Sequence, residues 1–214
     1  MGYSKVELVN QALDHLGKDR IASLSESSTA ARKANEILER VLHSALSRSH
    51  WTFARRLQSL AGLTNDWEER WRFKYDLPND MATFVRIVPR VDVPNTEPQV
   101  PHQLMGGAVY CNEPTAKAEY VYKSTDTLIW PQPFLDACAF LLARDLSMPL
   151  TRKQSLWADM NQAYEFQLGS AIEHDAGQEL TEYEQRSGGY IDARGGAEAE
   201  IDGAAPDGSI YWTS

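Results

Sequence analysis

The residues of this chain that could do chemistry are few and scattered. The nearest approach to a catalytic pair is the acidic run of Asp66, Glu68 and Glu69, because a glycosidase needs two carboxylates about 5 to 10 Å apart. These acids flank a turn beside Arg70, which is more typical of a solvated loop. The run therefore predicts no carboxylate pair for general acid and base catalysis.

Metal ligands and nucleophiles are equally sparse. His43 and His50 lie seven residues apart with no third ligand or interposed carboxylate, which makes a poor zinc site. Cys111 and Cys138 share no Cys-x-x-Cys or Cys/His spacing, so we expect two reduced, half-buried thiols. No GxSxG, HExxH or glycine-rich phosphate loop occurs. We therefore expect no catalytic residues, no metal site and no cofactor.

The charge is concentrated at one end of the chain. The 214 residues carry a formal charge of −9, with 43% apolar and 24% charged residues, as in ordinary folded proteins. From Gly177 onwards eight acids face two bases, so the body is nearly neutral. It has no basic footprint for tight nucleic-acid binding. No apolar run is long enough for a bilayer, so we expect no membrane association and a soluble, intracellular protein.

Helical periodicity dominates the first fifty residues. Ser4 and Glu7 form a capping-box pattern, Tyr3 can pack on Leu8, and Gly17 can end the helix in a left-handed conformation. A wide apolar stripe from residue 30 to residue 46 then predicts a longer amphipathic helix. This second helix runs directly towards Trp51.

Strand-like alternation replaces the helical period between residues 67 and 123. Alternating aromatic and polar residues predict a strand over 71–77, and further strands are expected over 84–88 and 117–122. Gly106 and Gly107 predict the turn of a small hairpin over 104–111. These segments predict a β meander with one apolar face, which needs helices to cover it.

Two more helices and an acidic tail complete the chain. Trp130-Pro131-Gln132-Pro133 is a helix start, Pro149 is expected to stop that helix, and Thr151 with Gln154 predicts a new capping box. The glycine-rich, acidic residues 177–214 predict a flexible arm. The arm ends in Ile210, Tyr211 and Trp212, which could insert into a groove of a partner.

The predicted fold class is mainly α with an inserted small antiparallel β meander (α+β), a helical bundle plus a flexible C-terminal arm. Trp51 and Phe53 stand where helix gives way to strand, so we interpret them as a structural hinge that anchors the sheet to the bundle. Arg55 and Arg56 follow them in the sequence. Two alternatives stand for these residues: exposure to solvent, or salt bridges with a neighbouring subunit. The expected segments are N-terminal helices over 1–60, a β-rich insertion over 61–128, C-terminal helices over 129–176 and the arm over 177–214.

The order of these parts resembles the head-to-tail adaptor (connector) proteins of tailed bacteriophages, most closely the tail tubular protein A type. The likeness covers residues 4 to about 175 and is weakest in the acidic arm. It rests on the following stretches: Leu13-Asp14-His15-Leu16-Gly17, Arg20-Ile21-Ala22-Ser23-Leu24, His50-Trp51-Thr52-Phe53-Ala54-Arg55-Arg56, Tyr75-Asp76-Leu77-Pro78-Asn79-Asp80, Val85-Arg86-Ile87, Trp130-Pro131-Gln132-Pro133-Phe134, Leu142-Ala143 and Met148-Pro149-Leu150-Thr151.

The resemblance implies a structural virion protein rather than an enzyme. Members form a homo-oligomeric ring, typically a dodecamer, which docks on the portal protein, carries the tail nozzle or tail tube protein below, and lets DNA pass through its channel. The implied location is the head-tail junction of the virion, and the host cytoplasm during assembly. In relatives the C-terminal arm reaches the portal, which makes Ile210, Tyr211 and Trp212 the candidate portal-binding residues. The β meander with its proline-rich loop over 89–101 is the candidate tail-facing surface.

Two other functions remain open from the sequence. Some relatives in short-tailed phages have been credited with cell-wall hydrolysis, which predicts an acid pair in a cleft. The chain could also be a helical adaptor that acts as a regulator in the bacterial host and is no part of the virion. A zymogram and a measurement of oligomeric state distinguish these alternatives.

Overall fold

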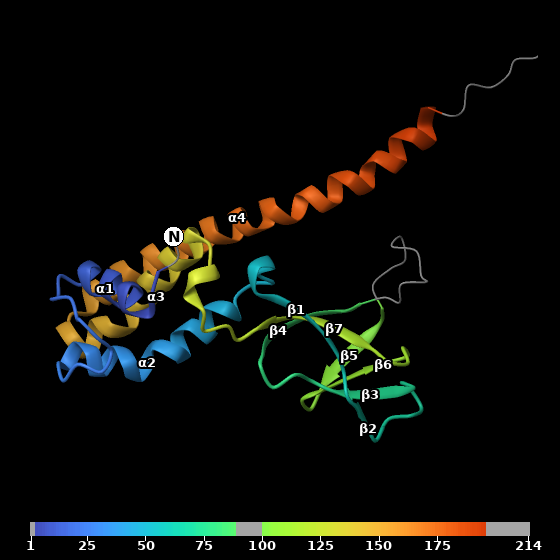
Figure 1. Ribbon diagram of the computed structural model, residues 1–214, viewed down its shortest axis with the longest axis horizontal. Coiled ribbons are helices and arrows are strands. Elements are labelled where there is room, and N and C mark those ends of the chain that lie inside the picture. Colours follow the sequence, from blue (N-terminus) through green and yellow to red (C-terminus); the bar gives the residue numbers. More distant parts are fainter. Residues whose placement is uncertain (1–2, 89–99, 196–214) are drawn as a thin grey trace, which may run out of the picture. The chain divides into compact units, whose positions relative to one another are not determined.

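The computed structural model describes the backbone of residues 3–88 and 100–195, and side chains as far as residue 178. The chain divides into two units, Met1–Gln178 and Glu179–Ser214. The described residues form four α-helices and seven strands, and every strand pairing is antiparallel (Figure 1). The predicted α+β class is confirmed.

The local signals at the first two helices are confirmed. α1 (Lys5–His15) begins with the complete capping box between Ser4 and Glu7. Gly17 follows the helix with a φ of +61°, a conformation that glycine adopts without a steric penalty. α2 (Thr29–Leu46) begins after Ser28, whose side chain accepts a hydrogen bond from the backbone N–H of Ala31. Its buried residues follow the predicted apolar stripe.

The C-terminal helices differ from prediction at three points. α3 (Gln132–Thr151) continues through Pro149, because a proline in the last turn removes only one hydrogen bond of the helix. The predicted capping box starts α4 at Thr151, but Thr151 is the last residue of α3, and its hydroxyl donates to the carbonyl of Ser147 and accepts from the backbone N–H of Lys153. α4 (Gln154–Gly195) extends well into the segment predicted as a flexible arm. Good helix formers among residues 178–186, chiefly Gln, Glu and Leu, support that extension.

Seven strands form two sheets rather than one continuous meander. Both sheets pair strands out of chain order, which brings β7 between two strands that are distant in sequence. Sheet A has the order β1 (Arg55–Ser59), β7 (Lys117–Tyr122), β4 (Met81–Val88). Sheet B has the order β2 (Gly62–Leu63), β3 (Phe73–Asp76), β6 (Ala108–Cys111), β5 (His102–Met105).

Several strand boundaries correct the sequence prediction. The hairpin of β5 and β6 turns at Gly106 and Gly107, both with positive φ, as predicted. β3 is shorter than the predicted strand, and β4 begins three residues earlier than predicted. β1 lies within the segment expected to be helical, where its exposed residues show no alternation that would reveal a strand. β1 is a strand because it pairs with β7, which lies about sixty residues later in the sequence.

The apolar core has three parts. The largest cluster joins all four helices to Trp51 and Val121. A second, smaller cluster lies between the sheets, around Tyr75, Ile87 and Val109. Trp71 and Tyr110 belong to a third cluster that Trp67 partly covers. Among the described residues no helix is long and apolar enough to cross a membrane.

Candidate functional site

The connection between α2 and sheet A is formed by buried aromatic and polar side chains from several elements. Trp51 follows α2, and its side chain is fully buried. Its indole Nε1 donates a hydrogen bond of 3.1 Å to the carbonyl of Ala45 in the last turn of α2. The ring therefore satisfies its one polar atom while the rest of it enters the main core.

Four aromatic rings from two distant segments meet at this connection. Phe134 of α3 lies in the middle, with ring centroids 4.7 Å from Trp51, 4.9 Å from Phe53 and 5.0 Å from Trp130. The Trp51 and Trp130 contacts have edge-to-face geometry, which aromatic pairs prefer over a face-to-face sandwich. We call Trp51, Phe53, Trp130 and Phe134 the aromatic joint. It ties the chain just before β1 to the start of α3.

A buried carboxylate from α4 hydrogen-bonds to the residue that follows Trp51. Asp175 is buried, and its carboxylate accepts hydrogen bonds from the backbone N–H of Thr52 at 3.0 and 3.1 Å and from the Thr52 hydroxyl at 2.6 Å. Thr52 begins the short 3-10 helix η1 (Thr52–Ala54), whose first N–H groups have no partner inside the helix. Asp175 thus caps η1 from a residue more than a hundred positions away.

Ion pairs bind the three strands of sheet A beyond the aromatic joint. Glu119 on β7 is buried between Arg55 of β1, at 3.3 Å, and Arg86 of β4, at 2.5 Å. Arg55 also donates to the carbonyl of His50. The charge of Glu119 is therefore compensated on both sides, as a buried carboxylate requires.

Arg56 forms a second polar connection on the opposite face of sheet A. Its guanidinium pairs with Asp80 at 2.6 Å and lies 4.0 Å from the ring centroid of Tyr122. The Tyr120 hydroxyl lies 3.0 Å from the same carboxylate, and burial raises the pKa of Tyr120 above its ordinary value. Both basic residues of the predicted junction are thus held within the chain.

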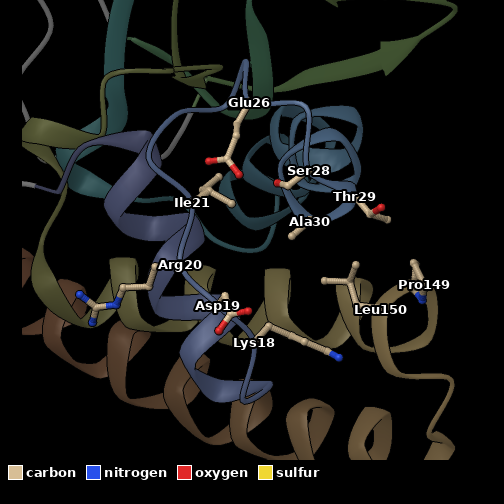
Figure 2. A pocket seen from close by; sticks show the side chains of 10 residues that line it. All are labelled: Lys18, Asp19, Arg20, Ile21, Glu26, Ser28, Thr29, Ala30, Pro149 and Leu150. Carbon is tan, nitrogen blue, oxygen red and sulfur yellow. The ribbon is translucent and has the colours of Figure 1, made fainter.

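A pocket of about 410 Å³ opens elsewhere on the same unit. It lies between the link from α1 to α2, the start of α2 and the end of α3, and three segments supply its apolar side chains Ile21, Ala30 and Leu150 (Figure 2). Lys18 and Arg20 also line it, but the Arg20 guanidinium turns away from the other side chains (Figure 2) and pairs with Asp14 at 2.7 Å.

The sequence candidates for chemistry do not come together as a site. Asp66 accepts hydrogen bonds from Lys74 at 2.8 Å and Tyr110 at 2.7 Å, and the Lys74 hydrogen bond lowers the pKa of this carboxyl below its ordinary value. Such a group is ionised at neutral pH and cannot serve as a general acid there. Both cysteines are buried and free, and burial raises the pKa of each thiol.

Metal ligands are also dispersed. In the part of the chain that the structure describes, no three His, Cys, Asp or Glu side chains gather in a way that could hold a metal ion.

Some sequence candidates lie outside the described residues. These are the candidate portal-binding residues Ile210, Tyr211 and Trp212, and most of the proline-rich loop, residues 89–99. Conversely, sequence reasoning missed Asp175 and the pocket. Asp175 is one of several acids on an exposed-looking stretch of α4, and no local pattern distinguishes it.

No protein-family model matches the chain, and no curated protein matches it.

Proposed function

We propose that this chain is a structural virion protein, a head-to-tail adaptor that forms a ring between the portal and the tail and lets DNA pass through the ring. Its partners are the portal protein above, the tail nozzle or tail tube protein below, and further copies of itself in a ring of the dodecameric type. Its task is mechanical, and it requires a fold whose parts do not move against each other while DNA passes.

The observation that carries the proposal is the aromatic joint. Two stretches on which the phage-adaptor resemblance rests, residues 50–56 and 130–134, are distant in sequence but meet there around Phe134. Shared order along a chain has many explanations. Shared order in which the similar stretches also pack on one another is what a common fold requires.

The construction of the joint supports the same role. Trp51 is held by α2, Thr52 by the Asp175 carboxylate of α4, and Arg55 by Glu119 of β7. Three residues of one short segment are thus held by three different elements. A packed core and hydrogen bonds between distant elements resist deformation, as a ring subunit under mechanical force needs.

The experiment that tests the proposal is assembly of phage particles without this chain. Heads are expected to fill with DNA but to remain without attached tails in electron micrographs, and adding the purified protein is expected to restore tail attachment. Tailed, infectious particles formed in its absence would refute the proposed function. A variant with Trp157→Ala, whose side chain is partly exposed on α4, is the matched control for restored attachment.

The proposed portal contact of Ile210, Tyr211 and Trp212 has its own test. Replacing all three by serine is expected to weaken binding to purified portal, because three large apolar side chains supply most of the apolar area of the proposed contact. Replacing Ser209, Thr213 and Ser214 by alanine is the control. Undiminished portal binding by the triple serine variant would remove this contact while leaving the adaptor role intact.

A further inference from the structure

We infer that Asp175 of α4 and Thr52 of η1 form a releasable latch, which couples the end of α4 within the first unit to the aromatic joint. With the latch closed, α4 is held on the rest of the unit as far as Asp175. With the latch open, the described apolar contacts of α4 end at Ala171 and η1 loses its cap. The latch belongs to one copy of the chain, so it does not depend on the proposed ring.

The apolar face of α4 ends well before the helix does. The α4 residues that belong to the large apolar cluster or pack against it are Leu156, Met160, Tyr164, Leu168 and Ala171. Of residues 172–178, only Asp175 is buried, and Ile172 is 37% exposed. Asp175 follows Ala171 by four residues, so it lies on the same face of the helix. The inward face of α4 therefore changes from apolar contacts to a single carboxylate.

The contact that Asp175 makes is polar on both sides. Its carboxylate accepts hydrogen bonds from the backbone N–H of Thr52 at 3.0 and 3.1 Å and from the Thr52 hydroxyl at 2.6 Å. When such a contact opens, water replaces the lost partners of all three groups. Water offers no such replacement to an apolar face, because exposure of apolar surface is unfavourable. The end of α4 can therefore detach more easily than the part before Ala171.

The helix itself is weak where the latch holds it. Gly177 lies two residues after Asp175, and glycine is among the least favourable residues in the interior of a helix. A Cβ at Gly177 would meet no atom within 4 Å, so packing does not require a glycine there. Few buried contacts and a weak helix are the features of a segment that opens locally while the rest of the fold stays closed.

Thr52 connects the latch to the aromatic joint. It stands between Trp51 and Phe53, two members of the joint, and it is the first residue of η1. Its backbone N–H has no partner inside that short helix, so opening of the latch leaves this group to water. The two ends of the latch therefore lie in α4 and in the segment that leads into sheet A.

The latch is also the first hold that a load on the C-terminal end of the chain meets. Counted back from Gln178, the last residue whose side chain is described, Asp175 is the first buried residue. The apolar contacts begin only at Ala171, four residues further back. Binding of a partner to the arm, as in the proposed portal contact, thus acts on the latch before it acts on the apolar core.

The test is amide hydrogen exchange of the full chain carrying Asp175→Asn, which keeps the shape of the side chain but removes one acceptor oxygen and the charge. Amides of residues 172–178 and of η1 are expected to exchange about tenfold faster, because loss of a charged hydrogen bond lowers the local free energy of opening. Amides of α4 before Ala171 are expected to keep their rates. Glu173→Gln, at an exposed acid of the same helix, is the matched control.

Thr52→Val tests the latch from its other end. The substitution keeps the backbone N–H and the size of the side chain but removes the hydroxyl. Because coupling between two sites is reciprocal, exchange in residues 172–178 is expected to speed up although none of these residues has changed. Asp175→Asn and Thr52→Val together are expected to have less than the sum of their separate effects on the free energy of opening, since both remove the same contact.

Two results overturn the inference. Exchange in residues 172–178 that is no faster in Asp175→Asn than in Glu173→Gln means that other contacts hold the end of α4. Equal acceleration over residues 154–178 means that Asp175 supports the whole helix and not a separable end. Either result, with the chain present in particles at the portal's copy number, leaves the proposed function standing. The expected exchange pattern in a chain that is absent from particles establishes the latch and refutes the adaptor role.

Discussion

The helical part and the sheets of this chain are stabilised in different ways. All four helices share one large apolar cluster, whereas the sheets have two small clusters around Ile87 and around Trp71. The sheets compensate with polar connections: Glu119 pairs with two arginines on the flanking strands, and Asp80 holds Arg56. The helices therefore depend on apolar burial, and sheet A depends on strand pairing and buried charge.

The difference explains why the connection between them is built as it is. The apolar clusters of the sheets are too small to fix the position of sheet A, because stabilisation by burial scales with the apolar area that is buried. Trp51 and Val121 extend the helical core to the sheet instead. Sheet A is therefore held in place by the helical core at one connection. A substitution at this connection should reduce the stability of the protein more than a substitution in the helices or the sheets alone.

Trp51→Ala tests this dependence and has the largest expected effect. Truncating a fully buried tryptophan is expected to reduce the free energy of unfolding by about 3 to 5 kcal/mol, through lost burial and a residual cavity. Chemical denaturation measures it. Trp157→Ala, at a tryptophan with 40% exposure, is the control and should cost far less. A loss below about 1 kcal/mol for Trp51→Ala would place the connection elsewhere.

Glu119→Gln tests the polar half of the comparison. The substitution leaves Arg55 and Arg86 without their shared carboxylate, and charged hydrogen bonds of this kind contribute about 1.5 to 3 kcal/mol. The control is Glu39→Gln, because Glu39 is 70% exposed and only 4.0 Å from Lys5, and such surface pairs contribute about 0 to 1 kcal/mol. Equal losses for the two variants in denaturant melts would mean that sheet A does not depend on buried charge.

Ser4→Ala probes the helical part at its edge. Loss of the side-chain cap of α1 is expected to cost about 0.5 to 2 kcal/mol, a smaller effect than loss of core burial because the large core remains. Ser27→Ala, just before the cap of α2, is the matched control. Thermal melts of both variants give the comparison, and a cost at Ser4 no greater than at Ser27 contradicts the role of the capping box.

The smallest expected effect depends on pH and concerns His15. Its ring stacks on Phe140 with centroids 4.1 Å apart, and burial lowers its pKa below the ordinary 6.5, against the opposing charges of Asp14 and Asp136. The folded state therefore resists protonation, so the stability contributed by neutral His15 is lost as pH falls below about 6.5. His15→Phe keeps the stack, and denaturant melts at two pH values should show a weaker loss on acidification. An identical loss in both proteins contradicts this assignment.

Local signals in the sequence predicted local structure well. The Ser4 and Glu7 capping box, the left-handed Gly17 and the glycine turn between β5 and β6 all follow from preferences of a few adjacent residues. The predicted length of α3 was wrong because Pro149 disturbs only the last turn of the helix. Thr151 fits a capping pattern, but its hydroxyl donates a hydrogen bond within α3, to the carbonyl of Ser147.

Long-range structure was not predictable from the same patterns. β1 has mostly exposed residues, and only its partner β7 makes it a strand. Trp51 and Phe53 stand out in the sequence, but Phe134, which they contact, is one apolar residue among many on α3. Asp175 gains its role through Thr52, more than a hundred residues away. Such partners depend on the tertiary arrangement, which local periodicity does not encode.

The measurement that tests the adaptor role most directly is the copy number of this chain in purified phage particles, by quantitative mass spectrometry with the portal protein as internal standard. The proposed ring predicts that the chain is present at a ratio to portal near one. It also predicts that the chain stays with DNA-filled heads when tails are stripped. Absence from purified particles, or a ratio that varies between preparations, would contradict the account.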